Sequence, residues 1–383
     1  MSDPRDTVYD AEPHTQAKHQ ILREYLKRWL PILSRQSQII GRTGGRLLYV
    51  DGFAGAGEYT DKIPGSPLVA IETALSHSRD FPVPVRIKLI ELRPDRVQHL
   101  RKLVAARRPE IEKSNRVILD DPIEGDCREV INGIIDACEQ EGRRLGPALF
   151  FLDQFGYSSF SMSLIGRILK HDVCEVFSYL NWNLLHPFMS DPAKRAGITS
   201  AFGGEEWMPV IELSGSQKED RFRDTYLDAL HSRAGAKYTY PFAMRDRSNR
   251  LIYWLFFCTN SLDGLKQMKR AMRRVDPSGG FQFSDRFASQ LGPLFTYGDD
   301  DLARDLSKEL DGQTMTVGEV EEFVLVNTPA SKYRRALGNL ERTKRLKPVD
   351  PPAGRPRHTF KDKGMKVRFI RPAKLDGPTL FSL

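Results

Sequence analysis

The chain has 383 residues, more than one hydrophobic core usually holds, so we expect two domains. Its 40% hydrophobic and 28% charged residues are typical of a globular protein, and no apolar run is long enough to span a bilayer. The polar, acidic N-terminal residues lack the features of a signal peptide, so we expect a cytoplasmic protein with no membrane partner.

The composition points to a polyanionic partner and not to a metal. Residues 332–374 hold fifteen Lys or Arg and three Asp or Glu, whereas residues 1–330 hold 43 basic and 46 acidic residues. Positive charge concentrated in one short segment favours binding to nucleic acid. None of the four cysteines has C-x-x-C spacing, so we expect reduced thiols and no metal site.

Apolar periodicity predicts an α/β domain over residues 18–285, after a flexible N-terminus at 1–17. Residues 18–34 have the spacing of an amphipathic helix. Strands are predicted at 46–50, 85–91, 117–125, 148–153 and 173–180, with helices between them at 66–78, 94–107, 127–141 and 162–170. This alternation predicts a parallel sheet with helices on both faces. A helix at 221–234, an antiparallel hairpin of 237–244 and 251–258 at the sheet edge, and a helix at 261–274 complete the domain.

Residues 286–374 predict a second, basic domain. A stretch rich in Gly, Pro and Phe at 276–298 marks the boundary between the domains. Helices are predicted at 301–310, 317–326 and 330–345, and short strands at 358–360 and 366–370. Three helices followed by a hairpin are typical of a winged-helix domain. Residues 375–383 are expected to form a tail.

A glycine-rich turn follows the first predicted strand, with the sequence Asp51-Gly52-Phe53-Ala54-Gly55-Ala56-Gly57. Open parallel sheets bind nucleotides at this edge, so Asp51, Phe53, Gly55 and Gly57 are candidate cofactor contacts. Both glycines would let the backbone approach a ligand and adopt positive φ. The spacing matches neither the full dinucleotide fingerprint nor a P-loop, and an ordinary strand-to-helix turn is the alternative.

Two further carboxylates are candidates for the same ligand. Glu91 ends the second strand, where a carboxylate can accept both hydroxyl groups of a ribose; a solvated strand end is the alternative. Asp126 precedes the helix at 127–141. It can accept the exocyclic amine of an adenine, or it can simply cap that helix.

The fourth strand leads into a candidate catalytic turn. Its apolar residues are followed by Asp153, Gln154, Phe155 and Tyr157. Asp153 and Gln154 can accept hydrogen bonds from an amine, and Phe155 or Tyr157 can stack on a base. A strand-end turn with buried aromatic side chains is the alternative. Asn181, after the fifth strand, is expected at the same edge, where it lines the pocket or serves only in packing.

The candidate nucleic-acid contacts are the basic residues of the C-terminal domain. Those around its last helix are Lys332, Arg334, Arg335, Arg342, Lys344 and Arg345, and those near the hairpin are Arg355, Arg357, Lys361 and Lys363. A recognition helix with a basic wing would follow the phosphates, and salt would weaken its binding. A solvated charged face is the alternative, but the scarcity of acidic residues here favours nucleic acid.

Together these motifs resemble a known family. The chain contains DGFAGAG, GSPL, IELRPDR and FLDQFGYSS, which resemble class I S-adenosylmethionine-dependent methyltransferases. With KHQILREYL and GLKQMKRAMRRVDPSGGFQF, they resemble more closely the three-Cys-motif partner family, over most of the chain. The resemblance implies a Rossmann-like sheet and a winged-helix-like end. It also implies a partner protein with a three-cysteine motif, similar to radical S-adenosylmethionine proteins.

By position, the resemblance implies a site for S-adenosylmethionine. Gly55 and Gly57 would face its methionine part, Asp51 its amino group, Glu91 its ribose and Asp126 its adenine. Asp153 would stand where amino-methyltransferases have Asp/Asn-Pro-Pro-Tyr or Asp-Pro-Phe-Gly. Gln154 replaces the proline of that motif, so the turn loses the stiffening that proline gives.

Two functions are therefore predicted. In the first, the chain transfers a methyl group from S-adenosylmethionine to an exocyclic amine of a nucleic-acid base, with Asp153, Gln154, Phe155 and Tyr157 as catalytic residues. In the second, it is a catalytically silent adaptor that binds nucleic acid or a three-cysteine-motif protein. A nucleotide hydrolase or nuclease is disfavoured, because the sequence has no P-loop lysine and no clear carboxylate cluster for a metal.

Overall fold

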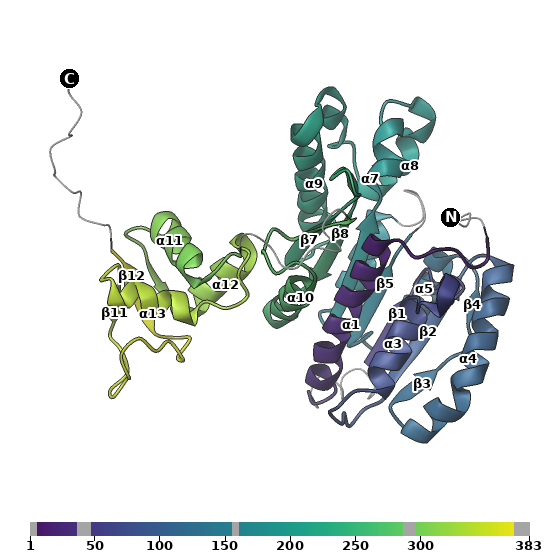
Figure 1. Ribbon diagram of the computed structural model, residues 1–383, viewed down its shortest axis with the longest axis horizontal. Helices are drawn as coiled ribbons and strands as arrows, with labels where there is room; N and C mark the ends of the chain where they lie inside the picture. Colours follow the sequence, from purple (N-terminus) through teal and green to yellow (C-terminus); the bar gives the residue numbers. More distant parts are fainter. Residues whose placement is uncertain (1–5, 37–46, 155–160, 286–295, 371–383) are drawn as a thin grey trace. The chain divides into compact units, whose positions relative to one another are not determined.

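The computed structural model describes residues 6–36, 47–154, 161–285 and 296–370. The chain divides into two compact units, Met1–Pro293 and Leu294–Leu383. This division falls shortly after the boundary that the sequence predicts at residue 286. Each unit has its own hydrophobic core, so each is described by itself (Figure 1).

The first unit is built on one mixed, mostly parallel sheet. Its strands are β1 (Leu47–Asp51), β2 (Val85–Glu91), β3 (Val117–Leu119), β4 (Ile123–Glu124), β5 (Ala148–Leu152), β6 (Cys174–Leu180), β7 (Tyr238–Arg245), β8 (Leu251–Thr259) and β9 (Gln282–Ser284). The order is β3-β2-β1-β5-β6-β8-β7-β9, with β4 beside β2. β8 is antiparallel to β6 and β7, so the predicted hairpin is confirmed. The hairpin does not form the edge of the sheet as predicted, because β9 pairs with β7 on its outer side.

Helices cover both faces of this sheet (Figure 1). One core contains residues of α1 (Pro13–Leu33), α3 (Ser66–Leu75), α4 (Pro94–Ser114) and α10 (Leu262–Val275). The other contains residues of α5 (Cys127–Gln140), α6 (Met162–Leu169), α7 (Trp182–Leu185), α8 (Arg195–Phe202) and α9 (Gly215–Ser232). Short 3-10 helices lie at Thr60–Lys62, His186–Phe188, Pro192–Lys194 and Met208–Glu212. β5 and β6 are buried on both faces, which explains their almost wholly apolar sequences.

Residues 6–17 contact the rest of the first unit. The prediction of a flexible N-terminus is wrong for residues 13–17, which form the start of α1. Residues 6–12 are also tied down: the Thr60 amide donates to the Tyr9 carbonyl (3.0 Å), and the Thr7 hydroxyl donates to Asp95 (2.6 Å). The polar sequence concealed this order, because the bonds are made to residues far along the chain.

The second unit has the element order of a winged helix. It consists of α11 (Asp299–Glu309), β10 (Thr314–Thr316), α12 (Val317–Asn327), α13 (Arg334–Arg342), β11 (Leu346–Val349) and β12 (Lys366–Phe369). Its antiparallel sheet has the order β10-β12-β11. The strand predicted at 358–360 is wrong, because α13 ends at Arg342 and the chain enters β11 at Leu346. Residues 350–365 are therefore the loop of the wing.

Among the described residues, no helix combines the length and apolar character needed to cross a bilayer. The four cysteines are free thiols. In the same ranges, no group of three or more His, Cys, Asp or Glu side chains is arranged to hold a metal ion.

A buried carboxyl group joins α1 to the sheet. Glu175 of β6 accepts hydrogen bonds from the Tyr25 hydroxyl of α1 (2.5 Å) and from the Thr259 hydroxyl of β8 (2.8 Å). Burial raises the pKa of Glu175, because the charged form loses its hydration. The carboxyl group therefore depends on its donors for polar compensation.

Replacing Tyr25 with Phe should lower the free energy of unfolding of the first unit by about 1–3 kcal/mol, because Glu175 loses a donor. Urea unfolding followed by tryptophan fluorescence measures this unit alone, because Trp29, Trp182, Trp207 and Trp254 all lie in it. In the double variant with Glu175→Gln, the loss should be smaller than the sum of the single losses. Strictly additive losses would contradict the coupling.

Candidate functional site

The carboxyl ends of three parallel strands bring the predicted carboxylates to one edge of the sheet. Asp51, at the end of β1, pairs in register with Leu89 of β2 and with Phe151 of β5. Glu91 and Asp153 therefore follow on either side of it. The strand order also reverses here, since β2 and β3 lie on one side of β1 and β5 and β6 on the other. In open α/β sheets such a switch point is where ligands bind.

The glycine-rich turn is held against this edge by Glu91. The Gly55 amide donates to Glu91 Oε2 (2.8 Å), and the Arg93 amide donates to Oε1 (2.9 Å). Gly55 and Gly57 have φ of 60° and 89°, as predicted. A Cβ atom at Gly57 would lie 2.6 Å from Leu100 Cδ1, whereas one at Gly55 would meet nothing within 4 Å. Gly57 therefore packs against α4, and the backbone at Gly55 faces open space.

The carboxylates among the candidate cofactor contacts differ in their exposure and in the hydrogen bonds that they already make. Glu91 is 8% exposed, and each carboxylate oxygen accepts one backbone amide. Each oxygen therefore keeps a lone pair that can accept a further hydrogen bond. Asp126 caps α5, as one of its two predicted roles requires, by accepting from the Arg128 amide (2.7 Å). Asp51 is fully buried and accepts from the Phe53 amide (3.3 Å) and the Tyr49 hydroxyl (3.3 Å). Burial raises the pKa of Asp51 to about 7.

A cavity of about 450 Å³ lies beside Asp153. Its lining residues are Tyr9, Asp10, Glu12, His14, Thr15, Lys18, Tyr59, Asp153, Gln154, Tyr179, Asn181, Ile252 and Tyr253. Asp153 Oδ2 accepts a hydrogen bond from Lys18 Nζ in a largely buried ion pair. Gln154 is buried, and its side-chain amide donates to the Tyr179 carbonyl (3.3 Å). Phe155 and Tyr157 lie outside the described residues.

The sequence analysis missed Lys18 and the tyrosines of this cavity. Lys18 lies on the same helical face as Ile21, Leu22 and Tyr25, all of which are buried. A lysine that continues an apolar stripe is a signal that it has a buried partner. Nothing in the local sequence could show that four tyrosines meet, because four separate segments of the chain bring them to the cavity. They are Tyr9, Tyr59, Tyr179 and Tyr253.

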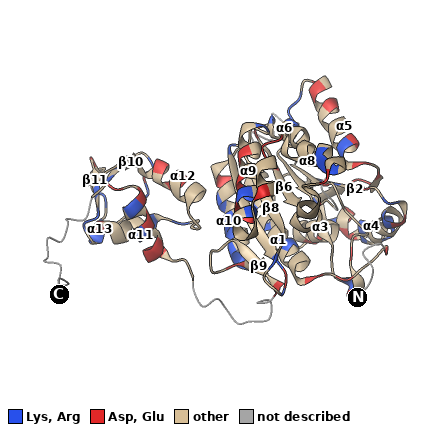
Figure 2. Cartoon of the chain, turned by 90° about the horizontal axis from the view of Figure 1, so that it is seen from above, with Lys and Arg blue, Asp and Glu red and all other residues tan. Residues whose placement is uncertain are grey.

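In the second unit, a groove of about 440 Å³ lies between α13 and the wing loop. Its lining residues are Asp299, Arg334, Arg335, Gly338, Asn339, Arg342, His358, Thr359, Phe360 and Lys361. Figure 2 shows the basic positions of α13 beside the acidic ones of α11. Lys332, Lys344, Arg345 and Arg357 are exposed outside this lining. Lys363 is also exposed and pairs with Glu321 (2.8 Å).

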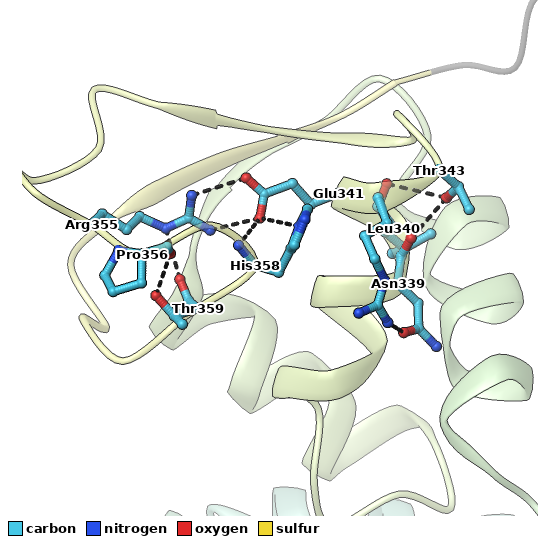
Figure 3. Close-up of polar contacts among 9 residues, drawn as sticks. Asn339, Leu340, Glu341, Thr343, Arg355, Pro356, His358 and Thr359 are labelled. Atoms are coloured by element: carbon cyan, nitrogen blue, oxygen red, sulfur yellow. Dashed lines mark hydrogen bonds and ion pairs between the residues drawn. The ribbon is translucent and has the colours of Figure 1, made fainter.

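Arg355 holds the wing loop against α13 (Figure 3). Its guanidinium forms two hydrogen bonds with Glu341 of α13 (2.9 and 2.8 Å), and its side chain is only 11% exposed. The His358 amide also donates to Glu341 Oε2 (2.9 Å). The arrangement therefore argues against the prediction that Arg355 binds nucleic acid, because its fork-shaped donor group is already used by a carboxylate. Arg334, Arg335, Arg342 and Lys361 remain as cations of the groove.

Comparisons with known proteins bear on the second unit. Residues 283–353 match a family model described as the GMT-like wHTH domain, in agreement with the winged-helix element order. Among solved structures, the chain is similar to a possible exported protein from Bordetella parapertussis, with 12% sequence identity and a TM-score of 0.30. That likeness covers 64% of this chain and 68% of the other. No curated protein matches the chain.

The buried Asp51 predicts a pH dependence of stability. Because its pKa in the folded state is raised from 3.8 to about 7, the fold favours the protonated form. Protonated Asp51 therefore contributes roughly 4 kcal/mol to the free energy of unfolding. This contribution is complete below pH 4 and is lost as the pH rises to about 7. In Asp51→Asn this loss should disappear, as measured by urea unfolding between pH 4 and 8. The exposed control Asp228→Asn should behave as the wild type, and a pH profile shared by all three proteins would contradict the assignment.

The Glu341 cluster predicts a local change in the wing. In Glu341→Ala the His358 amide and the Arg355 guanidinium lose their acceptor, so hydrogen exchange in residues 355–359 should accelerate at least about tenfold. Exchange measured by mass spectrometry or NMR resolves this loop from the rest of the chain. Arg335→Ala, an exposed change on the same helix, should leave the loop unaffected. Equal exchange in both variants would mean that Glu341 does not fix the wing.

Proposed function

We propose that the chain is an S-adenosylmethionine-dependent methyltransferase that acts on an exocyclic amine of a nucleic-acid base, with the winged-helix unit binding the nucleic acid. The observation that carries the proposal is the meeting of Gly55, Glu91 and Asp153 at one switch point of a parallel sheet, beside a cavity. Switch points position ligands in folds of this class. The antiparallel pairing of β7 and β8, which the sequence pattern predicts, completes the sheet beside these strands.

The residues at the glycine-rich turn fit the cofactor. The open space at Gly55 would admit a ligand next to the backbone, and the Glu91 carboxylate could accept the ribose hydroxyls. When bound, the cofactor supplies an activated methyl group. Asp51, in contrast, lies wholly inside the protein, so it supports the turn through the Phe53 amide and would not touch the cofactor.

The cavity beside Asp153 would receive the base. The Asp153 carboxylate could accept a hydrogen bond from the target amine and thereby fix the direction of its lone pair. Holding two reacting groups in line is a large part of what such a site contributes to rate. Gln154 cannot replace the missing proline in stiffening the turn, but its bond to the Tyr179 carbonyl restrains it in another way.

The second unit supports a nucleic-acid substrate. Residues 283–353 match the GMT-like wHTH model, and helix-turn-helix domains commonly bind DNA. Arg334, Arg335 and Arg342 lie along one face of a groove with Lys361 opposite, in a segment poor in acidic residues. Such a surface would contact phosphates, and its affinity would fall steeply with salt.

Two measurements on the full-length chain test the proposal. Calorimetry with S-adenosylmethionine should show binding by the wild type and by Asp153→Ala, and weakened binding by Glu91→Gln. Transfer of labelled methyl groups to mixed DNA and RNA should fall by about 100-fold or more in Asp153→Ala, because the amine loses its orienting acceptor. Asp228→Asn, an exposed change in α9, should leave both unchanged.

The outcomes separate the two predicted functions. Cofactor binding without transfer to any nucleic acid would favour the adaptor function, including one that requires a three-cysteine-motif partner. Absence of cofactor binding would overturn the methyltransferase proposal. Full transfer by Asp153→Ala would be compatible with the reaction but would show that Asp153 does not orient the amine.

A further inference from the structure

Lys18 contributes an unusual cation to the wall of the cavity. Its side chain is 6% exposed and pairs with Asp153, whose side chain is 13% exposed. Burying a lysine is costly unless an anion compensates its charge. α1 could have been anchored by an apolar residue at this position, as it is at Ile21 and Leu22. The pair instead exposes a donor and an acceptor side by side to the cavity.

Two tyrosine rings fix the position of the Lys18 ammonium. Nζ lies 5.4 Å from the ring centroid of Tyr179 and 5.6 Å from that of Tyr253. The rings themselves are 4.5 Å apart in an edge-to-face arrangement. Asn181 donates to the Tyr179 hydroxyl (2.6 Å), and the Tyr253 hydroxyl donates to the His14 carbonyl (3.3 Å). The ammonium is thus held by cation–π attraction and by the carboxylate, at a defined place in the wall.

The two groups complement one kind of ligand edge. The ammonium has three N–H donors, of which one points at Asp153, and the carboxylate has further lone pairs. An amino group next to an unprotonated ring nitrogen offers the matching donor and acceptor, as in adenine and cytosine. The amino group therefore belongs at Asp153 and the ring nitrogen at Lys18.

We infer that Lys18 and Asp153 together select an aromatic ring that carries an amino group beside a ring nitrogen, with Lys18 donating to that nitrogen. The assignment rests on the proposed function and makes Lys18 a specificity-determining residue of its site. An oxo group placed at Asp153 would bring two acceptors together and is disfavoured. Tyr179 and Tyr253 supply aromatic surface to the same wall, and about 450 Å³ is ample for one base.

The charges at the rim decide the choice of probe. Asp10 and Glu12 line the cavity and are exposed, so a small probe without a phosphate avoids repulsion by their carboxylates. Nucleosides, which have no phosphate, are therefore suitable ligands, and they also avoid the basic groove of the second unit. Binding to the full-length chain can be measured by saturation-transfer NMR titration without any methyl transfer.

The test compares adenosine with 1-deazaadenosine, in which a C–H group replaces the ring nitrogen next to the amine. The wild type should bind adenosine about tenfold more tightly, the value of one charge-assisted hydrogen bond. Cytidine and 3-deazacytidine form a second pair of the same kind. In Lys18→Met the preference within each pair should vanish, because the donor is gone. Lys18→Arg should restore part of it, and Lys27→Met, an exposed change on the same helix, should leave it intact.

Each outcome decides the assignment. A preference in the wild type that is lost in Lys18→Met supports it, even if no methyl transfer to nucleic acid is found. A purely structural Lys18 would lower stability in Lys18→Met but leave the preference unchanged, which would overturn the assignment. Equal binding of both members of each pair by the wild type, or no binding of adenosine and cytidine, would overturn it without any variant.

Discussion

The parallel register of β1 between β2 and β5 is the constraint on which the site depends. It places the ends of three strands side by side, so that a glycine-rich turn, Glu91 and Asp153 meet although up to about a hundred residues separate them in the chain. The Gly55–Glu91 hydrogen bond then closes the turn onto the neighbouring strand. Without that register the same residues would be unrelated surface groups.

Several residues that resemble ligand contacts are needed by the fold itself. Glu91 and Asp126 hold backbone amides, and Asp51 is enclosed among its donors. In the second unit Arg355 is used to attach the wing to α13. Such groups fix the backbone and side chains of a surface in place before a ligand binds. Supporting contacts of this kind determine how exactly a site is positioned. The groups that line the cavity of the first unit and the groove of the second, such as Lys18 and Arg335, are those that we propose for recognition.

Much of the architecture could be predicted from the sequence. The strand around 85–91 alternates in polarity, the strand around 148–152 is wholly apolar, and the helix starting at 127 follows the capping residue Asp126. The structure has all three within a residue or two. The positive φ of Gly55 and Gly57 was equally predictable. The residue types at the ends of β1, β2 and β5, together with the alternation of strands and helices, sufficed to locate the candidate site.

The rest depends on tertiary contacts that have no local signature. β9 and β10 are only three residues long and gain their order from their partners. α13 ends at Arg342, three residues before the predicted end, because the chain then enters β11. That strand pairs with residues about twenty positions later. Residues 6–12 appeared disordered, since their hydrogen bonds are made to residues such as Thr60 and Asp95. Lys18 could be recognised from its helical face, but Asp153 as its partner could not.

The most direct test of the central claim is a crystal structure of the full-length chain grown with S-adenosylmethionine. The account predicts the cofactor along the carboxyl edge of β1 and β2, with its ribose at Glu91 and its methionine part at the turn of Gly55. A cofactor bound elsewhere, or an edge between Gly55 and Asp153 filled by the protein's own side chains, would contradict it.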